Sequence, residues 1–202
     1  MSSHHIKRAQ PDHPVHELIA ERFSPYAYEP RPVEPEKLLA CLEAGRWAAS
    51  SYNEQPWSLF LGRREHEAEF QQVLDCLVEG NQAWAKNAGV LMITVAAETF
   101  SRNNNPNRVS DHDIGLFAAN LTFQATVLGL HVHHMAGVNL SKTRQAFGIP
   151  DGHHPLTAIA LGYAADPAAA SDKQLAEQDL APRTRKPLAD FVFAGGWKRS
   201  AV

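Results

Sequence analysis

Residues 111–130 impose the strongest limit on the fold, because they form a long helical stretch whose apolar residues point all round the helix axis. Ser110 or Asp111 is a suitable N-terminal cap, and Gly129 is a suitable stop. A helix that is apolar on every side is either central to a fold or shared with a partner subunit. The residues that define this stretch are Ile114, Leu116, Phe117, Leu121, Phe123, Val127 and Leu128.

The remaining pattern predicts helices that alternate with a few strands, which is typical of an α+β or α/β sandwich. Residues 90–96 are a continuous apolar run with Val and Ile, as expected for a buried strand. We interpret residues 1–12 as a flexible leader and 13–202 as a single domain. Helices are expected at 14–23, 35–47, 65–78 and 142–147, a helix break at Gly80–Gln82, further strands at 57–62, 131–138 and 156–163, a solvated connection with helical tendency at 165–181, and a last apolar segment at 187–193.

Composition excludes several classes of protein. A chain of 202 residues is long enough for one domain with a sizeable core, and its net charge of −3 gives no basic face for nucleic acid. Cys41 and Cys76 have neither CxxC nor zinc spacing, which favours a reducing, cytoplasmic location. The polar N-terminus is unlike a secretory signal, and no apolar run approaches the roughly 20 residues that span a bilayer. We therefore expect no nucleic-acid and no membrane partner.

Residues 48–57 form the loop with the richest chemistry. Ser50, Ser51, Asn53 and Gln55 offer hydrogen-bond donors and acceptors, and Trp57 adds an aromatic wall. Such a loop suits a flat, polar-edged, redox-active ring, although a solvated loop beside one buried Trp would have the same letters. Arg22 and Ser24 could likewise both donate to phosphoryl oxygens, or simply form a solvated helix end.

Five motifs follow one another in the order R-F-S, S-S-Y-N-E-Q-P-W, N-Q-A-W, H-M-A-G and R-T-R-K-P, from about residue 22 to residue 186. In order and spacing they closely resemble the nitroreductase family of FMN-dependent oxidoreductases, in a subgroup with an H-M-A-G flavin loop. The resemblance implies an α+β fold, a three-layer α/β/α sandwich around a mostly antiparallel sheet and a long buried helix. It also implies an interlocked homodimer with two FMN sites at its interface.

The resemblance assigns the cofactor site by motif. The first and last motifs would hold the FMN phosphate, the serine-rich loop would touch the flavin, in such dimers from the partner chain, and Gly137 would let backbone N–H groups approach flavin N5. Asn81 would bond the polar edge of the ring. The expected cofactor-binding residues are Arg22, Phe23, Ser24, Tyr26, Ser50, Ser51, Asn53, Gln55, Asn81, Trp84, His134, Met135, Ala136, Gly137, Arg183 and Arg185.

Three positions depart from the family pattern. Tyr26 replaces a second basic residue near the phosphate, so phosphate affinity would depend more on other residues. Trp84 stands where many relatives carry a Lys that stabilises reduced flavin. Either Lys86 supplies that charge instead, or reduced flavin is less stabilised and the flavin potential is lower. Alternatively, Asn81 caps a helix and Trp84 belongs to the core. Ala136 replaces a Glu beside N5, which could change the preferred electron acceptor.

Other chemistries have less support in the letters. His131 and His133 would share a face of a strand, but no acidic residue or third His supports a metal site, so none is expected. Asp111 and Asp113 lie at a helix N-terminus, where acids are stabilising in any case. The chain has no G-x-S-x-G elbow, no P-loop and no Rossmann G-x-G-x-x-G fingerprint.

The family implies a ping-pong reaction in which NAD(P)H gives a hydride to flavin N5 and an oxidant then takes the electrons. The oxidant would be a nitroaromatic, a quinone or an activated alkene, bound in the same cleft. Because the flavin carries the chemistry, no catalytic side chain is named. Two alternatives stay open: a flavin-dependent dehydrogenase or oxidase on the same fold, and a non-enzymatic FMN-binding protein.

Overall fold

A four-stranded antiparallel sheet in the order β1–β2–β4–β3 lies at the centre of the computed structural model, which describes residues 4–170 and 173–202. Its strands are β1 (Trp57–Arg63), β2 (Val90–Ala97), β3 (His131–Met135) and β4 (His153–Gly162). The inner strand β2 pairs with β1 and β4, and its residues 90–96 are at most 2% exposed. The apolar run at 90–96 is thus confirmed as a buried strand, because both of its faces are covered.

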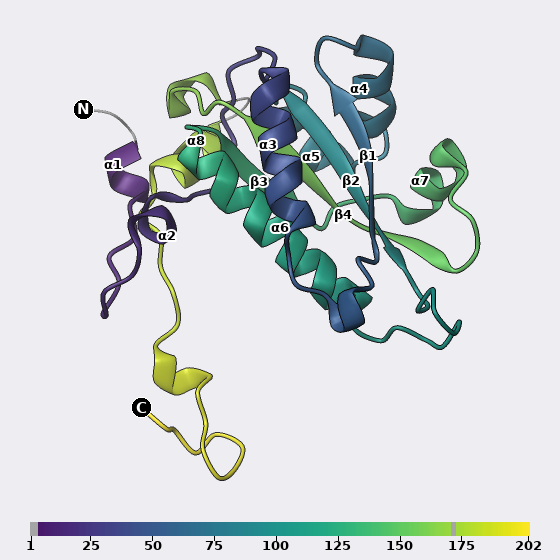
Figure 1. The fold of residues 1–202 in the computed structure, drawn as a ribbon. Coiled ribbons are helices and arrows are strands. Elements are labelled where there is room, and N and C mark those ends of the chain that lie inside the picture. The colour runs from purple at the N-terminus through teal and green to yellow at the C-terminus, as the bar shows by residue number, and fades with distance from the viewer. Residues whose placement is uncertain (1–3, 171–172) are drawn as a thin grey trace.

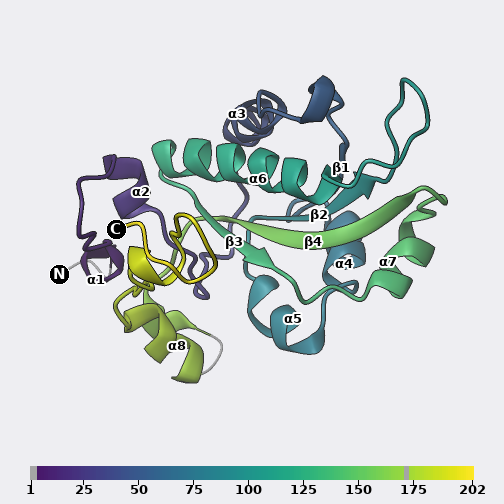
Figure 2. The same cartoon turned by 90° about the horizontal axis from the view of Figure 1, so that it is seen from below.

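Helices cover both faces of the sheet, which confirms the predicted three-layer sandwich (Figures 1 and 2). In Figure 2, α3 (Pro35–Arg46) and α6 (Ser110–Val127) lie on one face, and α4 (Glu67–Leu74), α5 (Glu79–Ala85) and α7 (Leu140–Phe147) lie on the other. The shorter elements are α1 (His4–Lys7), α2 (Glu17–Glu21), α8 (Lys173–Leu180) and the 3-10 turns Ser51–Asn53, Pro167–Ala169 and Leu188–Asp190.

The long helix α6 is buried along one face only. Phe117 and Leu121 pack into a cluster with α3 and the sheet, and Gly45 lets α3 approach so closely that an added Cβ would lie 2.6 Å from Phe117 Cζ. On the outward side, Leu116 is 37% and Val127 57% exposed. The expectation of a helix buried all round is therefore not met within one chain, because no element of this chain covers the outward face within the described residues.

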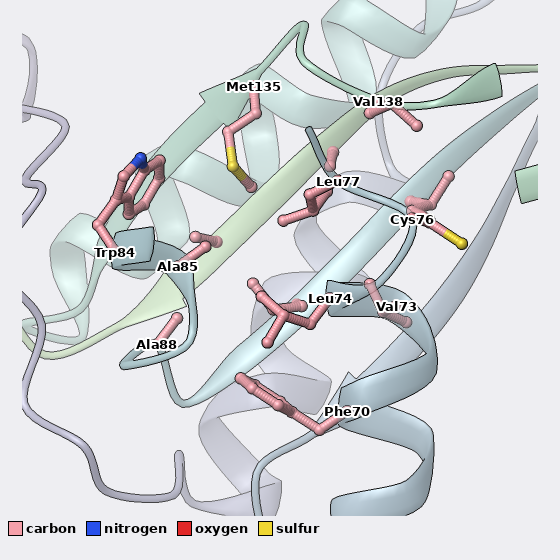
Figure 3. Packing of buried hydrophobic residues seen from close by; sticks show 14 of the residues in the cluster. Phe70, Val73, Leu74, Cys76, Leu77, Trp84, Ala85, Ala88, Met135 and Val138 are labelled. Atoms are coloured by element: carbon pink, nitrogen blue, oxygen red, sulfur yellow. The ribbon is translucent and has the colours of Figure 1, made fainter. Parts of the chain in front are cut away.

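The second core lies between the sheet and helices α4 and α5, as Figure 3 shows. Trp84 of α5 is its largest fully buried side chain and lies parallel to the Tyr28 ring at 6.2 Å. The predicted helix break at Gly80–Gln82 is wrong, because these residues lie inside α5. The break falls at residues 75–78 instead, and Gly80 is tolerated near the start of α5, where backbone N–H groups need no partner within the helix.

The short helix α1 contacts α8, and the Lys7 ammonium group donates to the Gln178 carbonyl. Part of the predicted leader is ordered here as α1, and the Ala9 amide donates to the Ala20 carbonyl at 2.9 Å; the predicted flexibility stays a prediction. Residues 1–3 of that leader and 171–172 of the predicted connection lie outside the described residues. After α8, residues 184–202 run away from the sheet (Figure 1). Among the described helices, none is long and apolar enough to cross a membrane.

Candidate functional site

Three guanidinium groups gather where the segment after α2 meets the segment after α8. Arg22 Nη1 donates to Ser24 Oγ at 3.2 Å, and the charges of Arg22, Arg183 and Arg185 act on one another. Burial, followed by the charge of Arg185, lowers the pKa of Arg22. Within residues 4–170 and 173–202, no carboxylate forms an ion pair with any of the three. Such an uncompensated cluster suits a phosphate dianion.

The three arginines have different local roles. Both terminal amino groups of Arg183 donate to backbone carbonyls, one to Arg22 and one to Ala20, so this side chain braces the segment after α2. Arg185 is exposed, and one of its amino groups donates a hydrogen bond to the Thr184 carbonyl at 2.7 Å. Because each guanidinium has five N–H donors, Arg22 and Arg185 keep donors that can reach a ligand.

Several of the predicted cofactor-binding residues are buried in the core. Phe23, Trp84 and Met135 are 6%, 1% and 3% exposed, which assigns their side chains to the core and not to a surface that a ligand can touch. The Tyr26 ring packs edge-on against Trp84 at 5.3 Å and against His133 at 4.7 Å. At the position where the resemblance predicts a basic residue, this chain therefore places an aromatic ring against the core.

The predicted flavin loop is held against α5. Gly137 accepts hydrogen bonds at its carbonyl from Asn81 Nδ2 at 3.2 Å and from the Val78 amide at 3.0 Å. Ala136 beside it is exposed. Asn81 lies inside α5 and does not cap it, so in this chain its amide fixes the loop in place.

Gly137→Ala should displace this loop. An added Cβ would lie 2.4 Å from Asn81 Nδ2 and 2.6 Å from Val78 Cγ2, so α5 or the loop must move. We expect a loss of about 1–3 kcal/mol in the free energy of unfolding, measured in urea. Gly115→Ala is the matched control, since an added Cβ there has no atom within 4 Å and a helical alanine should gain about 0.5–1 kcal/mol. Equal stability of the two variants would contradict the predicted crowding.

Strand β3 joins the arginine cluster to the flavin loop. At its start, the His131 ring contacts Phe23 with centroids 4.6 Å apart, and its last residue, Met135, leads into Ala136 and Gly137. Five strand residues span about 14 Å, which is the approximate distance along β3 between the side of the arginine cluster and the predicted flavin loop. The opposite face of the strand is fixed by His134, whose Nε2 lies 2.9 Å from Thr122 Oγ1 of α6.

His133 should make stability depend on pH. Burial lowers the pKa of this imidazole most strongly and Arg22 lowers it further, against opposing effects of the Pro25 carbonyl and Asp179. A folded-state pKa below the unfolded value near 6.5 stabilises the fold above that pH, and this contribution is lost as the pH falls toward the folded pKa. Wild type should therefore lose more unfolding free energy than His133→Gln between pH 7.5 and 5, by about 1.4 kcal/mol for each unit of pKa lowering. Exposed His112→Gln is the control, and parallel profiles for all three proteins would contradict the assignment.

The serine-rich loop lies elsewhere on the chain. The Ser51 amide donates to Asp113 Oδ2 at 3.0 Å near the N-terminus of α6, whereas α2 lies toward the opposite end of that helix (Figure 1). Tyr52, Asn53 and Gln55 have positive φ values of 53°, 56° and 55°, a costly conformation for residues with a side chain. One chain thus does not bring Ser50, Ser51, Asn53 and Gln55 to the arginine cluster.

Cavities and ionisable clusters do not offer a competing site for the predicted residues. One cavity of about 240 Å³ includes Glu98, Asp111 and His154 in its lining, and another of about 180 Å³ lies beside Phe147. Neither is lined by a predicted cofactor residue. His154 lies between the two carboxylates, 3.1 Å from Glu98 and 2.8 Å from Asp111. Among the described residues, no group of three ligands could hold a metal ion.

Two buried acidic residues anchor segments that contain predicted cofactor residues, and the sequence does not identify either of them. Asp113 was interpreted only as a helix-terminus acid, yet it is 4% exposed and anchors the serine-rich loop. Asp179, in the stretch interpreted as a solvated connection, is 3% exposed and accepts backbone hydrogen bonds from Tyr26 and Ala27. An acidic residue at an otherwise polar position gives no local signal of burial.

The layered α+β fold of the described residues is of nitroreductase type. The model of the Nitroreductase family matches residues 19–85 and 64–163, which is more than half of the chain. The chain therefore belongs to the nitroreductase family.

Individual relatives agree with this assignment. A solved oxidoreductase containing FMN is 33% identical with a TM-score of 0.88, over 95% of this chain and 96% of that one. A nitroreductase family protein from Clostridium difficile 630 is 22% identical with a TM-score of 0.69, over 89% and 97% of the two chains, and shows the fold alone. An uncharacterised 15.4 kDa protein of Mycolicibacterium smegmatis is 36% identical over 63% of this chain and 84% of its own.

Proposed function

We propose that the protein is an FMN-dependent oxidoreductase that uses NAD(P)H to reduce a nitroaromatic, quinone or activated alkene with ping-pong kinetics. The observation that carries the proposal is the uncompensated cluster of Arg22, Arg183 and Arg185, in a chain whose relative with a TM-score of 0.88 is an oxidoreductase containing FMN. A phosphate dianion beside these groups would neutralise charge that the described residues do not neutralise themselves.

The residues present fit FMN at both ends of β3. Arg22, Ser24 and Arg185 would hold the phosphate. Asn81 packs closely against Gly137 and donates to its carbonyl, which fixes the backbone of the loop that would lie beside the ring. When bound, FMN would supply the hydride and electron transfer chemistry. The protein would orient the ring and leave one face open to a nicotinamide or an oxidant. Because the sequence has no Rossmann fingerprint, NAD(P)H would visit this face transiently.

We also propose that the protein is a homodimer. The outward face of α6, with Leu116 and Val127, and the C-terminal residues Phe191 and Trp197 are apolar and exposed in one chain, at 37%, 57%, 57% and 85%. Apolar surfaces of this kind favour association. A second copy would also explain how Ser50, Ser51, Asn53 and Gln55 reach a flavin, since they lie far from the arginine cluster of their own chain. Light scattering should give twice the mass of the chain, and a monomer at micromolar concentration would contradict the proposal.

Steady-state assays test the proposed reaction. Protein reconstituted with FMN should oxidise NADH or NADPH in the presence of menadione or a nitrofuran, at a rate far above that of the same concentration of free FMN. Stoichiometric FMN without such turnover would contradict the proposed reaction. It would favour a dehydrogenase, an oxidase or a non-enzymatic flavin-binding protein, to which the departures at Tyr26, Trp84 and Ala136 also point.

A further inference from the structure

Asp179 is a buried carboxylate near the end of α8, and it binds a segment that lies more than 150 residues earlier in the chain. Its Oδ2 accepts hydrogen bonds from the Tyr26 and Ala27 amides, both at 2.9 Å, and its Oδ1 lies 3.1 Å from the Tyr26 amide. The side chain is only 3% exposed, and within the described part of the chain no basic group lies at ion-pair distance from it. A buried charge is costly unless hydrogen bonds satisfy it, so these amides are required partners.

Arg183 follows four residues later and grips the other end of the same segment. Its terminal amino groups donate to the carbonyls of Ala20 and Arg22. The two charged side chains therefore hold residues 20–27 at both ends, a carboxylate on two amides and a guanidinium on two carbonyls. Of the proposed phosphate ligands, Arg22 lies at the first of these points and Ser24 lies between the two.

We propose that Asp179 is a positioning residue for the FMN phosphate, an inference that rests on the proposed function. It fixes the backbone at residues 26–27 and thereby holds Arg22 and Ser24 in the geometry that receives the phosphate. Without this anchor, the segment would have to be ordered when the ligand binds, which weakens affinity. Its oxygens accept hydrogen bonds from backbone amides, so Asp179 does not compete with the phosphate for the arginines.

The comparison of FMN with riboflavin tests the role, because riboflavin lacks only the phosphate. Asp179→Ala should weaken FMN binding at least about tenfold and leave riboflavin binding unchanged, in fluorescence titrations of flavin-free protein. Asp179→Asn can place its amide oxygen where Oδ2 accepts both amides, so we expect its FMN affinity within about threefold of wild type. The control is Glu177→Gln, an exposed carboxylate on the same helix, which should match wild type.

Each possible outcome bears on the inference. FMN affinity that is unchanged in Asp179→Ala, or an equal loss for FMN and riboflavin, would overturn it, since the first excludes a role and the second indicates a general structural one. If Asp179→Ala does not fold, amide hydrogen exchange of the wild-type protein decides. Tyr26 and Ala27 amides that are already protected in flavin-free protein support the inference, and amides that become protected only when FMN is added overturn it. Wild-type protein that binds neither flavin would instead contradict the proposed function, before any variant is compared.

Discussion

Replacing both Arg22 and Arg185 with alanine is expected to release FMN while the fold survives. A hydrogen bond to a charged group contributes about 1.5–3 kcal/mol, so the loss of two such partners should cost about 3–6 kcal/mol of binding. The dissociation constant for FMN should then rise by roughly 10²- to 10⁴-fold. Fluorescence titration of flavin-free protein measures this change, and circular dichroism verifies the fold.

The control for this double variant removes the same charge elsewhere. Arg46 and Arg199 are exposed and lie outside the cluster, so Arg46→Ala with Arg199→Ala should leave FMN affinity unchanged. Riboflavin affinity should be similar in both double variants, because neither change touches the ring site. If the Arg22→Ala, Arg185→Ala variant kept stoichiometric FMN through purification, the assignment of these arginines as phosphate ligands would be wrong.

Trp84→Ala should cause the largest loss of stability among single substitutions considered for this chain. The side chain is 1% exposed and contacts the rings of Tyr28, Tyr26 and His133, with centroids at 6.2, 5.3 and 4.5 Å. Removing a buried aromatic side chain leaves a cavity, so we expect the free energy of unfolding to fall by about 3–5 kcal/mol. Because Tyr26 and His133 flank the arginine segment, flavin affinity should fall as well.

The measurement is denaturation in guanidinium chloride, followed by circular dichroism. Trp197→Ala is the matched control, since Trp197 is 85% exposed and its loss should change the unfolding free energy by less than about 0.5 kcal/mol in the isolated chain. Similar unfolding free energies for the two variants would mean that Trp84 is not a core residue. A dimer that buries Trp197 would instead show a concentration-dependent loss in the control.

Local sequence patterns predict an element well when its own residues indicate how it is buried. The run at residues 90–96 has the composition of a strand covered on both faces, and it is β2. Gly80 misled the prediction, because a glycine at the start of a helix looks the same in the sequence as a glycine that ends one. The sequence also could not predict how much of α6 is buried within one chain. An apolar outward face at Leu116 and Val127 does not indicate whether the same chain or another one covers it.

For the candidate site, the resemblance predicts which residues bind the cofactor but not which residues hold them in position. It predicted that Arg22 and Arg183 belong to one site, and the structure does bring them together. Asp113 and Asp179 could not be found in this way, because they act on amides 62 and 153 residues away and no local pattern records such contacts. The aromatic packing of Tyr26 is likewise set by the tertiary structure, as its contacts come from α5 and β3.

The most direct test of the proposed function is the visible absorption spectrum of the purified protein under anaerobic conditions, before and after NADH or NADPH is added. Protein reconstituted with FMN should show an oxidised-flavin spectrum that bleaches with at least one of the two nucleotides, and the more effective one is the hydride donor. A flavin that stays oxidised with both would contradict an NAD(P)H oxidoreductase. A protein that cannot take up FMN at all would contradict the flavin site itself.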